Sequence, residues 1–153
     1  MKAVLQRVID ASVTVGNVVK GSIKTGLLVY LGVAREDSGK DADWLAEKIV
    51  NLRVFNDSDG VMNLSLKEIA EKDPRAGLLA VSQFTLLADS RKGRRPSWNG
   101  AAESEKAREL YQYFITKIRA LGVTCESGEF QADMKVACAN DGPVTIILDT
   151  KDL

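Results

Sequence analysis

The feature that most constrains the fold is an unbroken apolar run, GLLVYLGV, at residues 26–33. It has the length of a strand and no polar face, which is typical of a strand buried on both sides. The chain has 153 residues, of which 45% are hydrophobic. A chain of roughly 150 residues can bury most of its unfolded surface in one core. We therefore predict a single domain over residues 1–153.

Several other segments have the pattern of strands. Residues 12–15 and 18–19 flank Gly16-Asn17, a pair that predicts a two-residue hairpin because glycine supplies the positive φ of a type II′ turn. Residues 140–142 (NDG) predict a second turn. The predicted strands beyond this hairpin are 2–9, 78–87, 123–129, 133–139 and 143–149, the last two joined by Asn140-Asp141-Gly142.

Two segments have helical periodicity. One helix is expected to begin near residues 38–43, with Leu45, Ile49 and Leu52 on its buried face. The second is expected over 101–121 and to end at Gly122. Its predicted apolar stripe consists of Ala107, Leu110, Phe114, Ile118 and Leu121. Many antiparallel strands with two main helices predict an α+β domain.

The chain contains no histidine, which excludes Ser-His-Asp and Cys-His catalysis and histidine-ligated zinc. Proton transfer would have to come from carboxylates, Lys, Tyr, backbone, water or the substrate. Cys125 and Cys138 form no metal-binding pattern and are predicted to be reduced, partly buried thiols. No apolar stretch approaches the roughly 18 residues of a membrane span, and no signal peptide is recognisable. We therefore expect a cytoplasmic protein with no membrane association.

A basic loop follows the predicted central strand. Arg91, Lys92, Arg94 and Arg95 concentrate positive charge in a chain whose formal net charge is zero, and Trp98 lies close by. Guanidinium groups match phosphate oxygens, so phosphate recognition is the functional interpretation. A solvated loop without a ligand is the alternative.

Polar side chains interrupt the predicted strand 78–87. Ser82, Gln83 and Thr85 would be costly to bury without hydrogen-bond partners. They either bond within the sheet or form the floor of a small-substrate pocket. Thr85 as a nucleophile lacks an obvious base. The segment 140–145 (NDGPVT), taken alone, predicts only a turn.

Together these segments resemble the D-aminoacyl-tRNA deacylase family. The resemblance begins with MKAVLQRV at residues 1–8 and rests on SQFTL (82–86), KGRRPSW (92–98) and NDGPVT (140–145). The order and spacing of the three motifs make it specific. Two departures are Gln131 where the family typically has glycine, and the less aliphatic Ala137-Cys138-Ala139.

The resemblance implies a barrel-like fold and a hydrolase that needs no cofactor or metal. Its substrates would be D-aminoacyl-tRNA and glycyl-tRNA mischarged on tRNA(Ala). It implies a homodimer in which a cis Gly142-Pro143 bond, held by Arg7, enters the partner's site and excludes L-amino acids. We expect the backbone N–H groups of Phe84 and Thr85 to bind the oxyanion and the tRNA 2′-hydroxyl to assist. The expected pocket residues are Ser82, Gln83, Phe84, Thr85 and Met134, and the expected tRNA contacts are Arg91, Lys92, Arg94 and Arg95.

The competing interpretation from another class is a noncatalytic RNA-binding domain that uses the same basic loop. Loss of a D-aminoacyl ester on incubation with the protein would separate the two. A small-molecule esterase, which would turn over simple esters without RNA, is a third interpretation.

Overall fold

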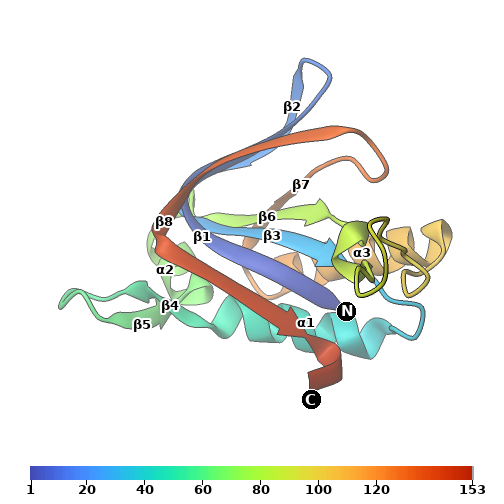
Figure 1. Ribbon diagram of the computed structural model, residues 1–153. Helices are drawn as coiled ribbons and strands as arrows, with labels where there is room; N and C mark the ends of the chain where they lie inside the picture. Colours follow the sequence, from blue (N-terminus) through green and yellow to red (C-terminus); the bar gives the residue numbers. More distant parts are fainter. Residues whose placement is uncertain (153) are drawn as a thin grey trace.

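The computed structural model describes residues 1–152, so Leu153, the last residue of the predicted domain, lies outside the described part. Its centre is a strongly curved sheet of six strands (Figure 1). These are β1 (Lys2–Val15), β2 (Val18–Ile23), β3 (Gly26–Gly32), β6 (Gly77–Ser82), β7 (Thr124–Ser127) and β8 (Met134–Asp149). The helices α1 (Gly39–Asn51) and α3 (Ser104–Ala120) lie together on one side of it.

Strand β1 organises the sheet. One of its edges pairs with β8 in antiparallel register from Lys2–Asp149 to Val15–Met134. Its other edge pairs first with β3 and then with β2, both antiparallel. β3, β6 and β7 continue the sheet in parallel. The sheet nearly closes on itself, because a Cβ added to Gly21 of β2 would lie 2.8 Å from the carbonyl oxygen of Ser127 in β7.

The mixed α and β composition and the barrel-like sheet are confirmed, with parallel pairs beside the antiparallel ones. The Gly16-Asn17 hairpin is also confirmed, since Val15 pairs with Val18 and Gly16 has a φ of +58°. Residues 2–9 and 12–15 prove to be one strand. Residues 133–139 and 143–149 likewise belong to the single strand β8, so the predicted hairpin at 140–142 is wrong. The turn residues there form a bulge within the strand instead.

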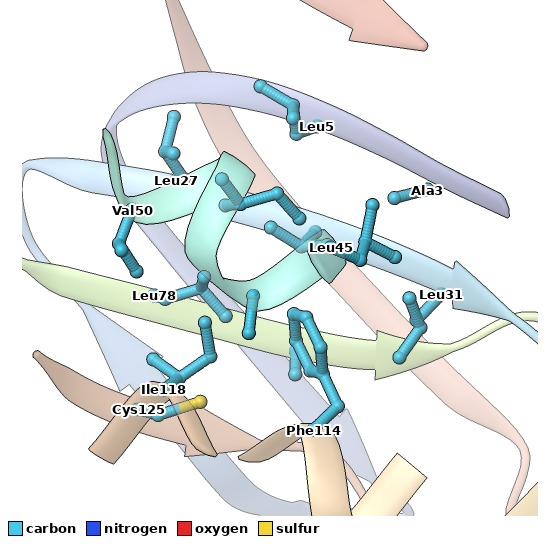
Figure 2. Packing of buried hydrophobic residues seen from close by; sticks show 14 of the residues in the cluster. Ala3, Leu5, Leu27, Leu31, Leu45, Val50, Leu78, Phe114, Ile118 and Cys125 are labelled. Atoms are coloured by element: carbon cyan, nitrogen blue, oxygen red, sulfur yellow. The ribbon is translucent and has the colours of Figure 1, made fainter. Parts of the chain in front are cut away.

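Both faces of β3 are buried, as its apolar run predicts. Leu27, Val29 and Leu31 face the two long helices, where they pack with Leu45 of α1 and Phe114 of α3 (Figure 2). Leu28 points the other way, into a second cluster inside the curve of the sheet. The members of that cluster are Val8, Ala11, Val13, Ile23, Leu28, Leu79 and Val81. The alternation of β6 follows the same rule, so these two strands carry the core of the domain.

The structure differs from the prediction in the number of helices and in where the helices begin and end. α1 begins after Ser38, whose backbone N–H donates to the Asp41 carboxylate at 2.8 Å in a capping box. Sequence patterning missed α2 (Leu66–Lys72) and the hairpin of β4 (Arg53–Asn56) and β5 (Met62–Ser65). Within residues 1–152, no helix combines the length and apolar character needed to cross a membrane.

The two thiols are free and differ in exposure, Cys125 being buried and Cys138 exposed. Burial raises the pKa of the Cys125 thiol to about 12. Because the thiolate is the reactive form, we expect Ellman's reagent to label one thiol per native chain near neutral pH and two in denaturant. Cys138→Ser should abolish the native labelling, and native labelling of Cys125 at the rate of a free thiol would contradict this assignment.

Candidate active site

The segment SQFTL lies where β6 ends. The N–H of Gln83 donates to the Leu31 carbonyl at 2.8 Å, which extends the parallel ladder by one residue. The chain then turns into the 3-10 helix η1 (Phe84–Leu87), closed by Leu86 N–H donating to the Gln83 carbonyl at 3.3 Å. The predicted strand 78–87 therefore ends at Ser82. As the first residues of a helical turn, Phe84 and Thr85 have N–H groups with no intrahelical acceptor.

The side chains of Gln83 and Thr85 are joined to each other. The Gln83 amide donates to the Thr85 hydroxyl oxygen. An amide cannot accept the proton that a nucleophilic hydroxyl must lose. The geometry therefore gives Thr85 a structural partner and no base.

A cavity of about 530 Å³ opens beside η1. Ser82, Gln83 and Phe84 form one part of its wall, and Met134, at the start of β8, forms another. Four of the five predicted pocket residues thus share one cavity. Thr85 does not line the cavity, but its hydroxyl is hydrogen-bonded to the side chain of Gln83, which does. Phe84 leaves 59% of its surface exposed, so this wall is open to solvent.

Two further residues that line the cavity, Tyr111 and Phe130, were missed by motif reasoning. Tyr111 of α3 donates its hydroxyl to the Ala80 carbonyl at 2.8 Å, and burial raises the pKa of this phenol. Phe130 packs against Tyr111 with 5.9 Å between ring centroids. Tyr111 follows Leu110 of the predicted stripe, so helical periodicity places it beside the buried face without marking it as a cavity residue. The hydroxyl proton of Tyr111 is held in this structural hydrogen bond. Among the residues that line the cavity, the carboxylate is that of Asp133.

The motif NDGPVT forms the bulge in β8. Gln6 pairs with Thr145 and Val8 with Asn140, so 141–144 have no partners in the ladder. The Asn140 amide closes the neck of the bulge by donating to the carbonyls of Arg7 (2.9 Å) and Val144 (3.2 Å). The Gly142-Pro143 bond at its tip is cis, and both residues are exposed.

Arg7 lies beneath this bulge and is only 6% exposed. Its Nη1 donates to the Val54 carbonyl at 2.6 Å and to Asn56 Oδ1 at 3.3 Å. Its Nε lies 3.0 Å from Asp141 Oδ2, an ion pair whose angles are outside those of a hydrogen bond. Arg7 therefore fixes the base of the Gly142-Pro143 bulge to the β4–β5 hairpin.

The bulge and the cavity are separate within one chain. Arg7 pairs with Leu27 at one end of β3, whereas Gln83 bonds Leu31 near the other. Four residues of strand correspond to about 13 Å at roughly 3.3 Å per residue. Neither Gly142 nor Pro143 lines the cavity beside η1. A single chain thus contains two distinct sets of predicted site residues. One consists of Arg7, Gly142 and Pro143 at the bulge, and the other of Ser82–Phe84 and Met134 at the cavity.

The basic loop is a hairpin closed by Asp89 and Ser97, which exchange backbone hydrogen bonds of 2.8 and 3.0 Å. Arg91 is tied to Asp89 by a two-pronged ion pair at 2.7 and 2.9 Å, and these hydrogen bonds hold the pKa of the Asp89 carboxyl well below its usual range. In residues 1–152, Lys92, Arg94 and Arg95 have no ion pair. Trp98 contacts Phe84 edge-on at 5.6 Å, which joins the loop to η1.

Metal ligation has no counterpart in the described residues, where no three Cys, Asp or Glu side chains gather as they would around an ion. The groups offered by the cavity and the adjoining η1 turn include the N–H groups of Phe84 and Thr85, the Gln83–Thr85 pair and the Asp133 carboxylate.

Comparison with known proteins identifies the family of this chain. The model of the family described as D-Tyr-tRNA(Tyr) deacylase matches residues 4–149, nearly the whole chain. The chain belongs to the D-Tyr-tRNA(Tyr) deacylase family. Membership makes it an enzyme, a hydrolase of the D-aminoacyl-tRNA deacylase class.

A curated relative and two solved structures are similar to this chain over nearly its whole length. A protein of Geotalea uraniireducens named D-aminoacyl-tRNA deacylase is 56% identical over 150 residues, covering 98% of this chain and 94% of the relative. The solved structure of a c-Myc DNA unwinding element binding protein is 40% identical, with a TM-score of 0.87, and covers 98% of this chain and 99% of that one. A structure titled as a probable eukaryotic D-amino acid tRNA deacylase shares the deacylase fold at 18% identity, with a TM-score of 0.80 over 96% of this chain and 97% of its own.

Proposed function

We propose that the protein hydrolyses the ester bond between a D-amino acid and the 3′ end of tRNA, and also acts on glycyl-tRNA mischarged on tRNA(Ala). Hydrolysis releases the free amino acid and tRNA. The substrate class follows from the deacylase family and from the printed names of the relatives. Glycine has no side chain for a steric filter to reject, so it enters the same site.

The active site is built between two copies of the chain. One copy supplies the cavity with Ser82, Gln83 and Phe84, and the other inserts Gly142-Pro143, whose backbone takes the space that an L side chain would need. Selectivity by exclusion of the wrong enantiomer is a recognised strategy for discriminating similar ligands. The observation that carries this proposal is the separation of the two sets of residues by about 13 Å along β3.

Catalysis uses backbone and substrate groups. The N–H groups of Phe84 and Thr85 stabilise the oxyanion that develops when water attacks the ester carbonyl. The 2′-hydroxyl of the terminal ribose positions or activates that water. The absence of histidine and the Gln83–Thr85 hydrogen bond both favour this division of labour.

The deciding experiment incubates the purified protein with D-Tyr-tRNA and L-Tyr-tRNA under identical conditions. We expect loss of the D ester only, with glycyl-tRNA(Ala) also cleaved. Binding of both without hydrolysis would favour the noncatalytic RNA-binding domain, and equal cleavage of both would contradict the chirality filter. Turnover of simple esters without RNA would favour the esterase. A cytoplasmic location, where charged tRNA is found, stays a prediction.

Thr85→Ala is expected to keep kcat within about tenfold of wild type, because the Thr85 hydroxyl serves Gln83 and performs no nucleophilic attack. Single-turnover kinetics with quenched samples analysed by mass spectrometry would check this. An acyl adduct on Thr85 in the wild-type protein, with no turnover by the folded variant, would overturn it.

Charge reversal in the basic loop is expected to weaken tRNA binding. Lys92→Glu with Arg94→Glu should raise Kd for tRNA by at least about tenfold and make the dependence of log K on log salt shallower by more than one unit, because each phosphate contact releases counterions. Arg91→Ala should have a smaller effect on that slope, since Arg91 is paired with Asp89. Filter binding between about 50 and 200 mM salt measures both. An unchanged slope in the double variant would remove these residues from the interface.

A further inference from the structure

The turn that connects β7 to β8 has an unusual backbone. Ala132 N–H donates to the Glu129 carbonyl at 3.2 Å, which closes a four-residue turn around Phe130 and Gln131. Gln131 has a φ of +66° and is the one non-glycine residue with positive φ in the described part of the chain. Positive φ at the third residue alone is the pattern of a type II turn, where glycine is strongly preferred. Glutamine is strained at this position.

Arg108 of α3 provides a compensating anchor for this turn. Its Nη2 donates to Gln131 Oε1 at 3.0 Å. The same guanidinium stacks over the Phe130 ring, 5.0 Å from the centroid. Phe130 in turn leans on Tyr111, which is bonded to the Ala80 carbonyl of β6. A continuous set of contacts therefore ties both central residues of the turn to α3 and to the sheet.

This turn forms part of the wall of the cavity. Phe130, Gln131, Ala132, Asp133 and Met134 all line it, together with Ser82, Gln83 and Phe84. The shape of the cavity therefore depends on where the turn sits. A turn released from α3 would change the fit of whatever occupies the cavity without moving the N–H groups of Phe84 and Thr85.

We propose that Arg108 and Gln131 are positioning residues whose hydrogen bond, the Arg108–Gln131 latch, fixes the turn-side wall of the cavity and so sets the affinity for the aminoacylated 3′ end of tRNA. The proposal rests on the proposed function for the identity of the occupant. The competing use of Arg108 is direct contact with an RNA phosphate, because its side chain is exposed.

The test is a double-mutant cycle with Arg108→Met, Gln131→Gly and the two combined. In the Gln131 background, Arg108→Met should raise KM for D-aminoacyl-tRNA about tenfold and change kcat less than about twofold. Glycine adopts the turn unaided, so in the Gln131→Gly background the same substitution should change KM less than about threefold. Arg108→Lys, which keeps the charge without the planar donor geometry, should resemble Arg108→Met.

Salt dependence separates the latch from a phosphate contact. The slope of log K against log salt should be the same for wild type and Arg108→Met. The matched control for the loss of one positive charge is Lys106→Met on the same helix. The ammonium group of Lys106 donates to the Arg35 carbonyl at 2.6 Å. An equal KM penalty for Arg108→Met in both backgrounds, or a slope reduced by about one unit, would overturn the latch and assign Arg108 to RNA.

Amide hydrogen exchange in the free protein keeps this inference separate from the proposed function. Arg108→Met should speed exchange at residues 130–133 about tenfold with Gln131 present and leave it unchanged in the Gln131→Gly background. A wild-type protein that cleaves no D-aminoacyl-tRNA would refute the proposed function, whereas an Arg108→Met effect on exchange that is equal in the two backgrounds would refute the latch.

Discussion

Replacing Gly142 by alanine should lower kcat/KM for D-aminoacyl-tRNA by at least about 100-fold, equivalent to about 2.7 kcal/mol of transition-state stabilisation. Gly142 has a φ of +115°, where L side chains are strained by about 1–3 kcal/mol. A Cβ there would also lie 2.7 Å from Arg7 Nη2 and 2.9 Å from Val144 Cγ2. Arg7 is held by Val54 and cannot withdraw without breaking that hydrogen bond. The bulge must therefore move, and the geometry that we propose it presents to a partner's cavity is lost.

Steady-state deacylation of D-Tyr-tRNA measures this loss, and the L ester measured in parallel shows whether selectivity falls as well. Gly60→Ala is the matched control, because Gly60 also has positive φ (+78°) but has open space around its Cβ position and lies in the turn between β4 and β5. Both variants should remain folded by circular dichroism. If Gly142→Ala is folded and as active as Gly60→Ala, the bulge has no part in the active site.

Removing the terminal 2′-hydroxyl of the tRNA is the second change with a large expected effect. A D-aminoacyl ester on a 2′-deoxy terminal ribose should be hydrolysed about 100- to 1000-fold more slowly in kcat, the range seen when one transition-state donor is removed. The protein has no histidine to take over, and the Thr85 hydroxyl accepts from an amide. KM should change little, because one hydroxyl contributes a small part of tRNA affinity.

The alternative source of a base is Asp133, the carboxylate at the cavity. Asp133→Asn preserves the size of the side chain and removes the basic group. We expect it to retain kcat within about tenfold. The reverse pattern, with the deoxy substrate cleaved at the normal rate and Asp133→Asn inactive, would transfer the catalytic role from the substrate to the protein.

Sequence patterning predicted the parts of the fold that depend on local periodicity. The apolar run 26–33 became β3, the Gly16-Asn17 pair became a hairpin, and the stripe around Phe114 became the buried face of α3. These elements are specified by the chemistry of adjacent residues, so a single sequence is sufficient to find them.

Two errors have a common physical cause. The turn residues at 140–142 predict a hairpin, but β1 is long enough to pair with β8 on both sides of them, so they form a bulge. The polar residues after Ser82 read as strand, but β3 ends at Gly32 and leaves no edge for 84–87 to pair with. In both places the partner strand decides the outcome, and the partner is distant in the sequence.

The candidate site was found through motifs and not through periodicity. Ser82, Gln83, Phe84 and Met134 meet at one cavity, although each motif alone admits an ordinary structural role. Tyr111 and Arg108 were missed because nothing in a helical pattern distinguishes a residue facing a cavity from one facing the core or solvent.

The pairing of β1 with β8 also affects how the protein is made. Strand β1 is synthesised well before β8, with which it pairs along one edge from Lys2–Asp149 to Val15–Met134. During translation that edge stays without its partner, and an unpaired strand edge is a template for association with other chains. Nascent chains stalled before residue 134 should therefore recruit chaperones more than chains released after β8 has been completed.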